Sequence, residues 1–535
     1  MRIMRRVLGG LLLSVVASIT EHRVVAQPAA PPNIVIIFAD DLGYGDVGAF
    51  GAPNIRTPRL DAMAAEGQKW TNFYVQPVCS PSRAALLTGR LPVRNGMFGT
   101  PGGMAPKVFR DNASQGLPTE EVTIAEVVKS RGYTTGMIGK WHLGQLPEFL
   151  PMRQGFDSWF GLPFSHDMRM TVPGDKGLQT DAYYEPKPEY WDVPLMRNNE
   201  VIERPVDHRT LTKRYTEEAL RFITTNRDRP FFLYLAHSLP HIPLARSDGY
   251  VGHSSGGIYG DVIEEIDWST GQVLDGLRAA GVEQRTLVIF TSDNGPWLPF
   301  RSHGGSAGPL KEGKGTTWEG GVRTPAIFWW PGTVRPGVVT DLGSGLDLMV
   351  TAAALAGAQP PTDRVVDGVD LTAPLRGSGP SPRDRLFYYW DSELRAIRKG
   401  KHKAHFITSG AYGEGERRTV HTPPLLFDLA ADPGERFNIA AAHSDIVADL
   451  IREAEMHRRT VALTKPLFDE LLPTDVALWD PEVGALQVVV PHHPPAHLGQ
   501  GGVVVRLGIP RIRAERNSRP MCSASRKIAV PRAVS

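Results

Sequence analysis

Short apolar runs that stop abruptly at polar residues recur along the chain and limit the folds open to it. The first run, Asn33 to Phe38 (NIVIIF), ends just before Asp40 and Asp41. Similar runs are GYTTGMIG at 132–139, PFFLYLA at 230–236 and TLVIF at 286–290. Runs that are apolar on both faces suit the central strands of a parallel sheet that is covered on both sides.

Helical patterns lie between these runs. One covers Thr123 to Gly132, and a longer one, Tyr259 to Gly281, has apolar residues at helical spacing and a glycine at its end. This alternation predicts an α/β fold with a large, mostly parallel sheet sandwiched by helices. Ligands of such sheets bind beyond the carboxyl ends of the strands, so functional residues are expected there.

The character of the sequence changes near Arg376. DRLFYYW and LRAIRKGKHKAHF resemble short strands, and the helical segment HSDIVADLIREAEMHRRTVA follows them. We therefore predict a smaller C-terminal domain with an antiparallel sheet. The predicted division is a signal peptide at 1–26, a catalytic domain at 27–375, an α+β subdomain at 376–472, and a tail at 473–535 that lacks periodicity and is expected to be poorly ordered.

The first residues are typical of an export signal. Arg2, Arg5 and Arg6 precede an apolar run, Val7 to Ile19, that is too short to span a bilayer comfortably. We expect cleavage before Gln27 and a protein that is periplasmic or secreted, or of lysosomal type in a eukaryote. An uncleaved membrane anchor is the alternative, and no later segment is apolar and long enough to cross a membrane.

Charge and cysteine content exclude several classes of protein. The chain has 59 basic and 57 acidic residues, so its net charge of +2 provides no field that would attract nucleic acid or an anionic membrane. Cys79 and Cys522 are the only two cysteines, so an exported chain of this kind is not a disulfide scaffold. Cys79 therefore needs another explanation.

Oxygen-bearing side chains follow two of the predicted strands. Asp40 and Asp41 follow the first run, and Asp293 and Asn294 follow the TLVIF run. Three carboxylates at neighbouring strand ends would repel one another unless a cation lay among them, and an all-oxygen set favours Ca²⁺ or Mg²⁺ over zinc. The alternative is that each pair only caps a turn.

Cationic and imidazole side chains follow other strands. Lys140 and His142 stand two residues apart just past a strand, where alternate residues of an extended chain share a face. Two further pairs lie after the PFFLYLA run and in a glycine-rich loop: His237 and His241, and Lys311 and Lys314. Each could be solvated surface, but their repeated delivery to one sheet edge favours an anion pocket.

The stretch PVCSPSRAALLTGR predicts a helix start beside Cys79. Ser80 suits the N-cap, Pro81 suits the first helical position, and Gly89 suits the end. The helix N-terminus together with Arg83 would favour an anion and activate a thiol. A soft thiolate is nevertheless a poor match for an oxygen-ligated hard cation, so we expect the side chain of Cys79 to be changed chemically.

The segment Cys79 to Arg83 resembles the signature Cys-x-Pro-x-Arg of the type I sulfatases, in which the cysteine is oxidised after translation to Cα-formylglycine. The resemblance extends over about 33–438, is strongest to the branch of arylsulfatase A and N-acetylgalactosamine-6-sulfatase, and includes FADDLGYGD, GKWHLG, LPFSHD, HIPL, SDNGP and GKGTTWEGGVRTPA. It implies the alkaline-phosphatase-like sulfatase fold.

The resemblance also implies roles for individual residues. The ligands of one calcium ion, or of magnesium in its place, would be Asp40, Asp41, Asp293, Asn294 and the modified residue at Cys79. The remaining roles are Arg83 stabilising formylglycine, Lys140 and Lys314 holding sulfate oxygens, His142 assisting at position 79, His241 protonating the leaving oxygen, and Ser165 lining the sulfate pocket. No role transfers to His237 or Lys311.

The implied activity is hydrolysis of a sulfate monoester to an alcohol and inorganic sulfate, with a hydrated aldehyde as nucleophile. A formylglycine-generating or anaerobic sulfatase-maturing enzyme would then be a partner. A phosphate or phosphonate monoester hydrolase of the same superfamily and a non-catalytic binding protein are the alternatives. An aryl, sugar or lipid sulfate stays open as the substrate, and so does a homo-oligomer.

Overall fold

The computed structural model describes residues 31–102, 106–172, 181–413 and 415–473. All of them fall within one compact unit, and a second unit, Ala485–Ser535, lies outside the described residues. The predicted signal peptide, Cys522 and all of the predicted tail except Pro473 also lie outside them, and the predicted domain boundaries stay predictions. Within the described ranges, no helix combines the length and the apolar character needed to cross a membrane.

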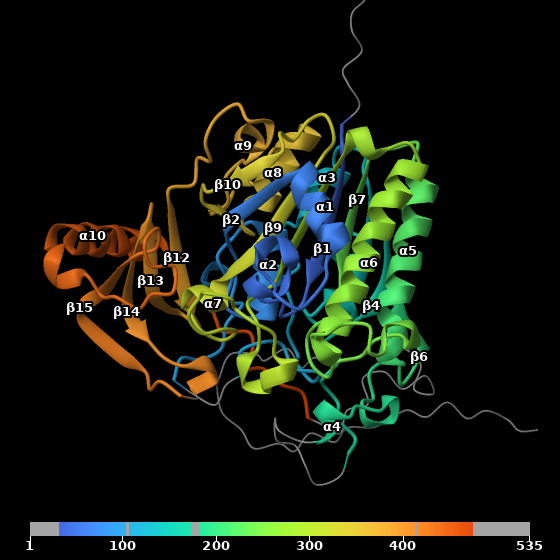
Figure 1. Cartoon of the computed structure of the whole chain (residues 1–535), viewed down its shortest axis with the longest axis horizontal. Helices are drawn as coiled ribbons and strands as arrows, with labels where there is room; N and C mark the ends of the chain where they lie inside the picture. Colours follow the sequence, from blue (N-terminus) through green and yellow to red (C-terminus); the bar gives the residue numbers. More distant parts are fainter. Residues whose placement is uncertain (1–30, 103–105, 173–180, 414, 474–535) are drawn as a thin grey trace, which may run out of the picture. The chain divides into compact units, whose positions relative to one another are not determined.

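A large mixed sheet forms the centre of the described part of the chain (Figure 1). Its strand order is β10-β2-β9-β8-β1-β7-β3-β4-β5-β6, with β11 paired to β2. The pairs formed by β1, β3 and β7 are all parallel, whereas β9 runs antiparallel to both its neighbours. The strands are β1 Asn33–Ala39, β2 Gln68–Tyr74, β3 Thr134–Lys140, β4 Ser158–Leu162, β5 Leu195–Arg197, β6 Glu200–Glu203, β7 Phe231–Ala236, β8 Thr286–Ser292, β9 Arg323–Trp329, β10 Gly337–Val339 and β11 Gly343–Ser344.

Helices cover both faces of this sheet, as the apolar runs predict. In β1, Ile34, Ile36 and Phe38 face one core, and Val35 and Ile37 face the other. The first core includes α2 Cys79–Thr88, α3 Ile124–Lys129, α8 Asp347–Ala356 and α9 Thr372–Arg376. The second includes α1 Pro58–Glu66, α5 Leu211–Asn226 and α6 Gly257–Ala279. Two short helices, α4 Asp181–Tyr184 and α7 Glu319–Val322, complete this region.

The observed helix ends follow from local capping. The segment expected to be helical from Thr123 to Gly132 forms α3, and Thr123 is its N-cap. The Thr123 side chain accepts a hydrogen bond from the Glu126 amide, and the Glu126 carboxylate accepts one from the Thr123 amide. This reciprocal pair satisfies two amides that a helix start otherwise leaves free.

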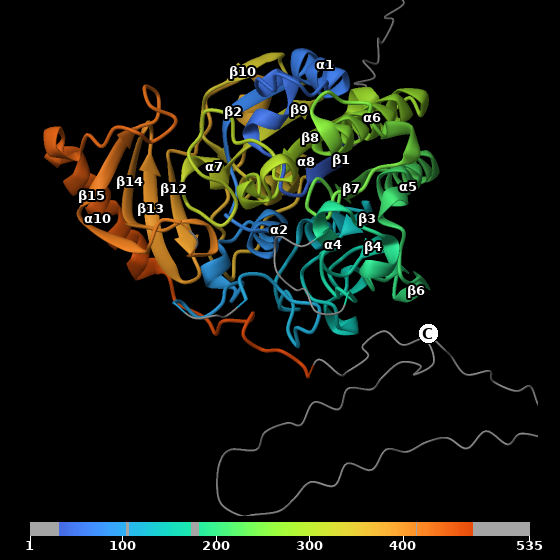
Figure 2. The same cartoon turned by 60° about the horizontal axis from the view of Figure 1, so that its bottom comes forward.

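A second, antiparallel sheet with the order β12-β13-β14-β15 confirms the expected change of structure (Figure 2). Its strands are β12 Arg385–Trp390, β13 Glu393–Lys399, β14 His402–Thr408 and β15 Thr419–Asp428. The helix α10 Ser444–Thr460 buries Val447 and Leu450 against Ile397, Ala404 and Leu426 of this sheet. Apolar contacts between sheet and helix therefore form a core of its own beside the large sheet.

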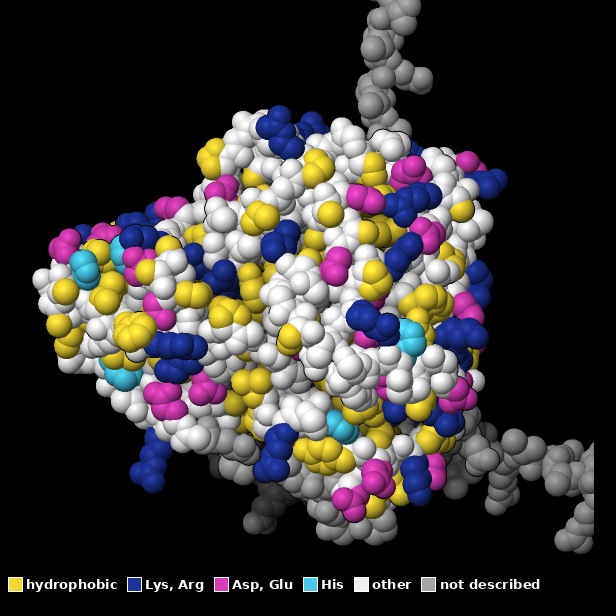
Figure 3. Space-filling model, viewed as in Figure 1, with side chains coloured by type: hydrophobic (Ala, Val, Ile, Leu, Met, Phe, Trp, Pro, Cys, Tyr) yellow, Lys and Arg dark blue, Asp and Glu magenta, His cyan; other side chains and the backbone are white. Residues whose placement is uncertain are grey.

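The surface agrees with the even balance of charges. Figure 3 shows Lys and Arg side chains interspersed with Asp and Glu over the visible face. A mixed surface of this kind lacks a single-sign field that would steer a polyanion. The selectivity for an anion must therefore arise locally, at the ends of the strands.

Candidate active site

The site lies at the carboxyl ends of β1 and β8. These strands pair in parallel, with Ala39 opposite Ser292, so Asp40 and Asp293 leave the sheet at the same level. The Asp293 amide donates a hydrogen bond to the Ala39 carbonyl over 3.1 Å, which extends the pairing by one residue. The two polar pairs that follow these strands in the sequence are therefore adjacent in space, as the strand order requires.

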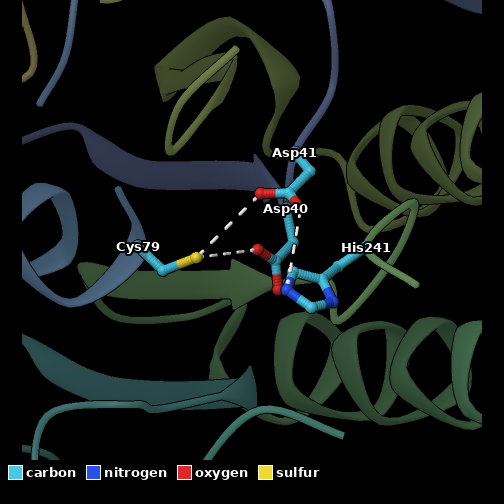
Figure 4. A group of neighbouring side chains, drawn as sticks. All are labelled: Asp40, Asp41, Cys79 and His241. Atoms are coloured by element: carbon cyan, nitrogen blue, oxygen red, sulfur yellow. Dashed lines mark hydrogen bonds and ion pairs between the residues drawn. The ribbon is translucent and has the colours of Figure 1, made fainter. Parts of the chain in front are cut away.

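Cys79 faces the two carboxylates that follow β1 (Figure 4). Its Sγ lies 3.5 Å from Oδ1 of Asp40 and 4.0 Å from Oδ1 of Asp41, and Nε2 of His241 lies 3.6 Å from Oδ2 of Asp41. These four residues are buried, and their ligand atoms lie within 4.8 Å of one another. The arrangement could hold a metal ion.

Asp293 and Asn294 complete the oxygen-rich group. The Asp41 amide donates to Oδ1 of Asp293 over 3.1 Å, and Nδ2 of Asn294 donates to Oδ1 of Asp41 over 2.7 Å. The buried Oδ1 of Asn294 has no hydrogen-bond partner among the described residues. A buried acceptor without a donor is costly, and a hard cation would satisfy it. The residues present therefore fit a calcium or magnesium ion.

Three cationic side chains reach the same group. Lys140 Nζ lies 2.5 Å from Oδ2 of Asp40 and 3.0 Å from Oγ of Ser165. The other two cationic contacts are Lys314 to Asp41 at 2.9 Å and Arg83 to Asp293 at 2.9 Å. Three buried carboxylates thus meet three buried cations, so each cation is held in place by an acidic partner at the ends of the strands.

The pKa values of the three carboxyl groups diverge. Burial opposes ionisation of Asp40, but Lys140 and Arg83 outweigh it and hold its pKa well below the usual range. Burial raises the pKa of Asp41 to about 7 in spite of Lys314. Burial and the neighbouring Asp40 also raise the pKa of Asp293. The protein's own cations do not stabilise all three negative charges, so an added cation would find unmet demand.

The helix that presents Cys79 begins two residues earlier than expected. α2 starts at Cys79 with Val78 as N-cap, and no side chain caps it. The expected capping role of Ser80 is wrong, because its hydroxyl donates instead to the His142 carbonyl over 2.8 Å. The predicted end is confirmed, since Gly89 has φ 69°, a left-handed conformation that favours glycine.

An unmodified thiol at this position would be a weak nucleophile. Burial and then Asp293 raise the pKa of Cys79 well above its ordinary value, in spite of Lys140 and Lys314. The expectation that the helix N-terminus would activate the thiol is therefore wrong, because burial beside acidic groups dominates. The finding agrees with the argument that sulfur is unsuited to this site.

His142 lies in the same charged region, but strand alternation does not place it there. β3 ends at Lys140, and His142 has φ 57°, so the two residues do not share the face of an extended strand. Nε2 of His142 contacts the Phe109 carbonyl at 2.9 Å, and its buried Nδ1 has no partner among the described residues. Burial, Lys140 and Arg83 lower its pKa well below the usual value.

His237 and Lys311 lie apart from this group. Nε2 of His237 contacts the Ser269 hydroxyl at 3.3 Å, and Lys311 Nζ lies 3.4 Å from the ring centroid of Trp318. The residue pattern alone grouped them with the pocket, whereas the resemblance gave them no role. The geometry agrees with leaving them out.

Two aromatic residues beside the site were missed from the sequence. The Trp297 ring centroid lies 4.2 Å from Lys314 Nζ and 5.3 Å from the ring centroid of His241. Tyr412 packs on Trp297 with ring centroids 5.8 Å apart. Trp297 follows Asn294 by three residues, so proximity to that motif was an available signal. Tyr412 belongs to the second sheet and offered none.

Comparison with known proteins agrees with this geometry. Residues 32–358 match the family described as Sulfatase, and residues 381–481 match the C-terminal region of aryl-sulfatase. The chain belongs to the sulfatase family. The predicted family is confirmed, as is the prediction of an enzyme that hydrolyses sulfuric esters.

Named sulfatases share much of their length with this one. Arylsulfatase A of Bos taurus is 44% identical over 474 residues, which cover 82% of this chain and 89% of the relative. N-acetylgalactosamine-6-sulfatase of Mus musculus is 42% identical over 454 residues, covering 79% and 84%. The crystal structure of PsFucS1 sulfatase from Pseudoalteromonas sp. matches with a TM-score of 0.72 at 30% identity, covering 81% and 92%.

The fold also occurs outside the sulfatases. A phosphonate monoester hydrolase of Agrobacterium radiobacter matches with a TM-score of 0.56 at 20% identity, covering 81% of this chain and 96% of that one. A likeness at this level shows the shared fold alone. The expected sulfatase fold is confirmed.

Proposed function

We propose that this sulfatase hydrolyses a sulfate monoester to an alcohol and inorganic sulfate, using formylglycine made from Cys79 and one calcium ion. The observation that supports it best is the placement of Cys79, buried at the start of α2 with Sγ directed at Asp40 and Asp41. A cysteine so placed is unreactive as a thiol and well positioned as an oxygen-bearing group.

The residues present suit both groups that the family implies. Bound together, the ion and the hydrated aldehyde would supply a metal-polarised oxygen nucleophile for attack on sulfur. The side chains that would hold the ion are Asp40, Asp41, Asp293 and Asn294. The unpartnered Oδ1 of Asn294 and the raised pKa values of Asp41 and Asp293 support this assignment.

Lys140 and Lys314 would bind and orient the sulfate group, and Arg83 would stabilise formylglycine. Lys140, Lys314 and Arg83 converge on the carboxylates from three different elements, and each is at most 3% exposed. Negative charge that builds on sulfuryl oxygens as the ester bond breaks is stabilised by donors already in place, at several kcal/mol for a well-placed donor. Ser165, held by Lys140 at 3.0 Å, adds a hydroxyl that can donate to a sulfate oxygen.

His241 is placed to give a proton to the leaving oxygen. Its Nδ1 lies 2.5 Å from the Ile242 carbonyl, which orients the ring and leaves Nε2 directed toward the pocket at Asp41. Burial, Lys314 and Lys140 lower its pKa well below the usual value, so the ring is neutral at rest and, once protonated on Nε2, would be a strong acid toward the leaving oxygen. His142 lies two residues beyond the end of β3, and we propose that it assists the modified residue at position 79.

A phosphate or phosphonate monoester hydrolase is the second candidate, because that fold is shared. The two lysines argue against it. Lys140 and Lys314 supply single positive charges to the pocket, which suits the singly charged sulfate monoester better than a doubly charged phosphate monoester. A panel of 4-nitrophenyl sulfate and 4-nitrophenyl phosphate separates the two, and a phosphate preference in modified enzyme would overturn our choice.

Maturation and export are part of the proposal. A formylglycine-generating or anaerobic sulfatase-maturing enzyme would oxidise Cys79, and the leader at 1–26 would direct the chain to a periplasmic, secreted or lysosomal-type compartment. A homo-oligomer is compatible with the function, and sulfated aryl, sugar or lipid alcohols are the candidate substrates.

The decisive experiment combines mass and activity. The peptide containing residue 79 is expected to be lighter than its cysteine form by about 18 Da, the difference between CH₂SH and CHO. Cys79→Ala should lower kcat for 4-nitrophenyl sulfate by about 1000-fold or more, because the nucleophile is lost.

Ser82→Ala is the matched control, since Ser82 lies on the same helix at a variable position of the signature and should leave the mass difference in place. Circular dichroism of both variants checks the fold. An active preparation whose residue 79 is an unmodified thiol contradicts the formylglycine mechanism.

A further inference from the structure

The turn between β14 and β15 brings an aromatic residue of the second sheet to the active site. Tyr412 has φ 53° and ψ 20°, a left-handed conformation that is unusual for a bulky side chain. It is also 38% exposed. A strained backbone that holds a large exposed ring is costly for folding, and such strain clusters at binding and catalytic sites.

Three contacts hold the Tyr412 ring beside the loop that carries Lys314. A Cβ built on Gly315 would lie 2.9 Å from Cε2 of Tyr412, so the ring packs directly on the residue that follows Lys314. Its centroid lies 5.8 Å from that of Trp297 and 5.9 Å from that of Trp390. We call Tyr412, Trp297 and Trp390 the aromatic platform.

The platform continues the pocket outward from the reacting groups. Trp297 contacts both Lys314 and His241, which would hold the sulfate and protonate the leaving oxygen. Tyr412 packs on Trp297 and is the most exposed of the three rings.

We propose that the aromatic platform is the subsite for the leaving alcohol and that a ring of this alcohol stacks on it. This inference rests on the proposed sulfate ester hydrolysis. A flat or chair-shaped ring stacks on an exposed aromatic face over a large area, whereas a flexible chain loses conformational entropy on ordering. Sugar and aryl rings share this chemistry.

The test compares Tyr412→Gly with Tyr412→Phe in the mature, calcium-loaded enzyme. Glycine removes the ring and also relieves the left-handed backbone, whereas phenylalanine keeps the ring. The substrates are 4-nitrophenyl sulfate and a hexose 6-sulfate, and inorganic sulfate serves as a competitive inhibitor that fills only the sulfate pocket.

We expect Tyr412→Gly to lower kcat/KM for the ring esters by about 10- to 100-fold, mainly through KM. The inhibition constant for inorganic sulfate should stay within about threefold, and the melting temperature should be unchanged or higher because the strain is gone. Tyr412→Phe should retain kcat/KM within about threefold. A merely structural tyrosine would instead lower the melting temperature of the glycine variant.

The outcomes are distinct. A loss limited to the hexose ester assigns a sugar to the platform, and a loss limited to the aryl ester assigns an aromatic alcohol. Equal kcat/KM for Tyr412→Gly and wild type on both esters overturns the platform, and so does a tenfold loss in Tyr412→Phe. A wild-type enzyme that hydrolyses no sulfate ester contradicts the proposed function itself, a result that is separate from the fate of Tyr412.

Discussion

Two buried groups of charges in this sulfatase look alike in composition and differ in how well they are satisfied. The acidic pocket consists of Asp40, Asp41, Asp293 and Asn294 with their lysines and Arg83. The support cluster consists of Glu319, Lys403, His405 and Glu435, where the second sheet meets the loop that carries Lys314. Side chains in both groups are nearly inaccessible to solvent.

The support cluster pairs each carboxylate oxygen within the protein. Lys403 Nζ lies 2.8 Å from Glu319 and 3.2 Å from Glu435, and it donates to the Thr317 carbonyl over 2.8 Å. Tyr74 donates to the other oxygen of Glu319 over 2.6 Å, and the Glu319 amide donates to the other oxygen of Glu435. Burial opposes ionisation of Glu435, but Lys403 and His405 outweigh it and lower the pKa of Glu435 to about 2.

The acidic pocket is less completely paired. The pKa of Asp40 is lowered, but the pKa values of Asp41 and Asp293 are raised, and an amide oxygen of Asn294 has no partner among the described residues. The difference teaches that charge composition alone does not separate a binding site from a structural ion cluster. Nδ1 of His405 in the support cluster also lacks a partner among the described residues, so the two groups differ in the pairing of their oxygens, which are the atoms that a hard cation binds.

The largest predicted effect is a loss of folding stability when the support cluster loses its lysine. Lys403→Met should lower the free energy of unfolding by about 3 to 5 kcal/mol, because it leaves two buried carboxylates without their shared cation. Urea denaturation measures this loss. Lys399→Met is the matched control on the neighbouring strand, since Lys399 is 34% exposed and pairs with Asp449 and Glu453 at the surface.

The control should lose no more than about 1 kcal/mol. Equal losses in the two variants would mean that the buried pairing adds nothing beyond a surface ion pair, and the contrast between the two groups would weaken accordingly.

The next effect is a pH dependence of stability from Glu435. Its pKa falls from an ordinary 4.5 to about 2 in the folded chain, so its contribution is complete above pH 4.5 and is lost as the pH falls toward 2. The shift corresponds to on the order of 3 kcal/mol. Denaturation of wild type and Glu435→Gln between pH 6 and 3 measures it as a stability difference that shrinks on acidification.

A difference that stays constant across this range would contradict the lowered pKa. A difference that grows on acidification would reverse the assigned sign and make the support cluster resemble the acidic pocket.

The smallest predicted effect is the stabilisation of the acidic pocket by calcium. Calcium at about 100 times its dissociation constant should stabilise the wild type by about 2.7 kcal/mol, measured by thermal unfolding with and without a chelator. Asn294→Ala should reduce this calcium-dependent shift, because it removes an oxygen ligand. Glu435→Gln, although less stable overall, should keep the shift in full.

A calcium effect that is equally large in wild type and Asn294→Ala would remove Asn294 from the ion site. Loss of the effect in Glu435→Gln would show that the two groups are coupled rather than separate.

The sequence predicted that Asp40 and Asp293 lie close together, because the residues that follow neighbouring parallel strands lie at the same edge of the sheet. Asp40 and Asp293 needed only the recognition of two strands, and the register of β1 with β8 then places them together. The motif resemblance supplied Cys79 and Ser165, which no periodicity could assign. Reasoning from local geometry was weaker, as the capping of α2 by Ser80 and the strand alternation of His142 show.

The sequence by itself determined the alternation of strands and helices, the positions of the charged residues at strand ends and the family signature. The tertiary structure alone decided which oxygen stays unpartnered, which carboxylates are paired and that Tyr412, between β14 and β15, packs on Gly315 beside Lys314. Patterns along the chain report on near neighbours, whereas contacts such as Lys140 with Asp40, 100 residues apart, arise only when buried faces pack together.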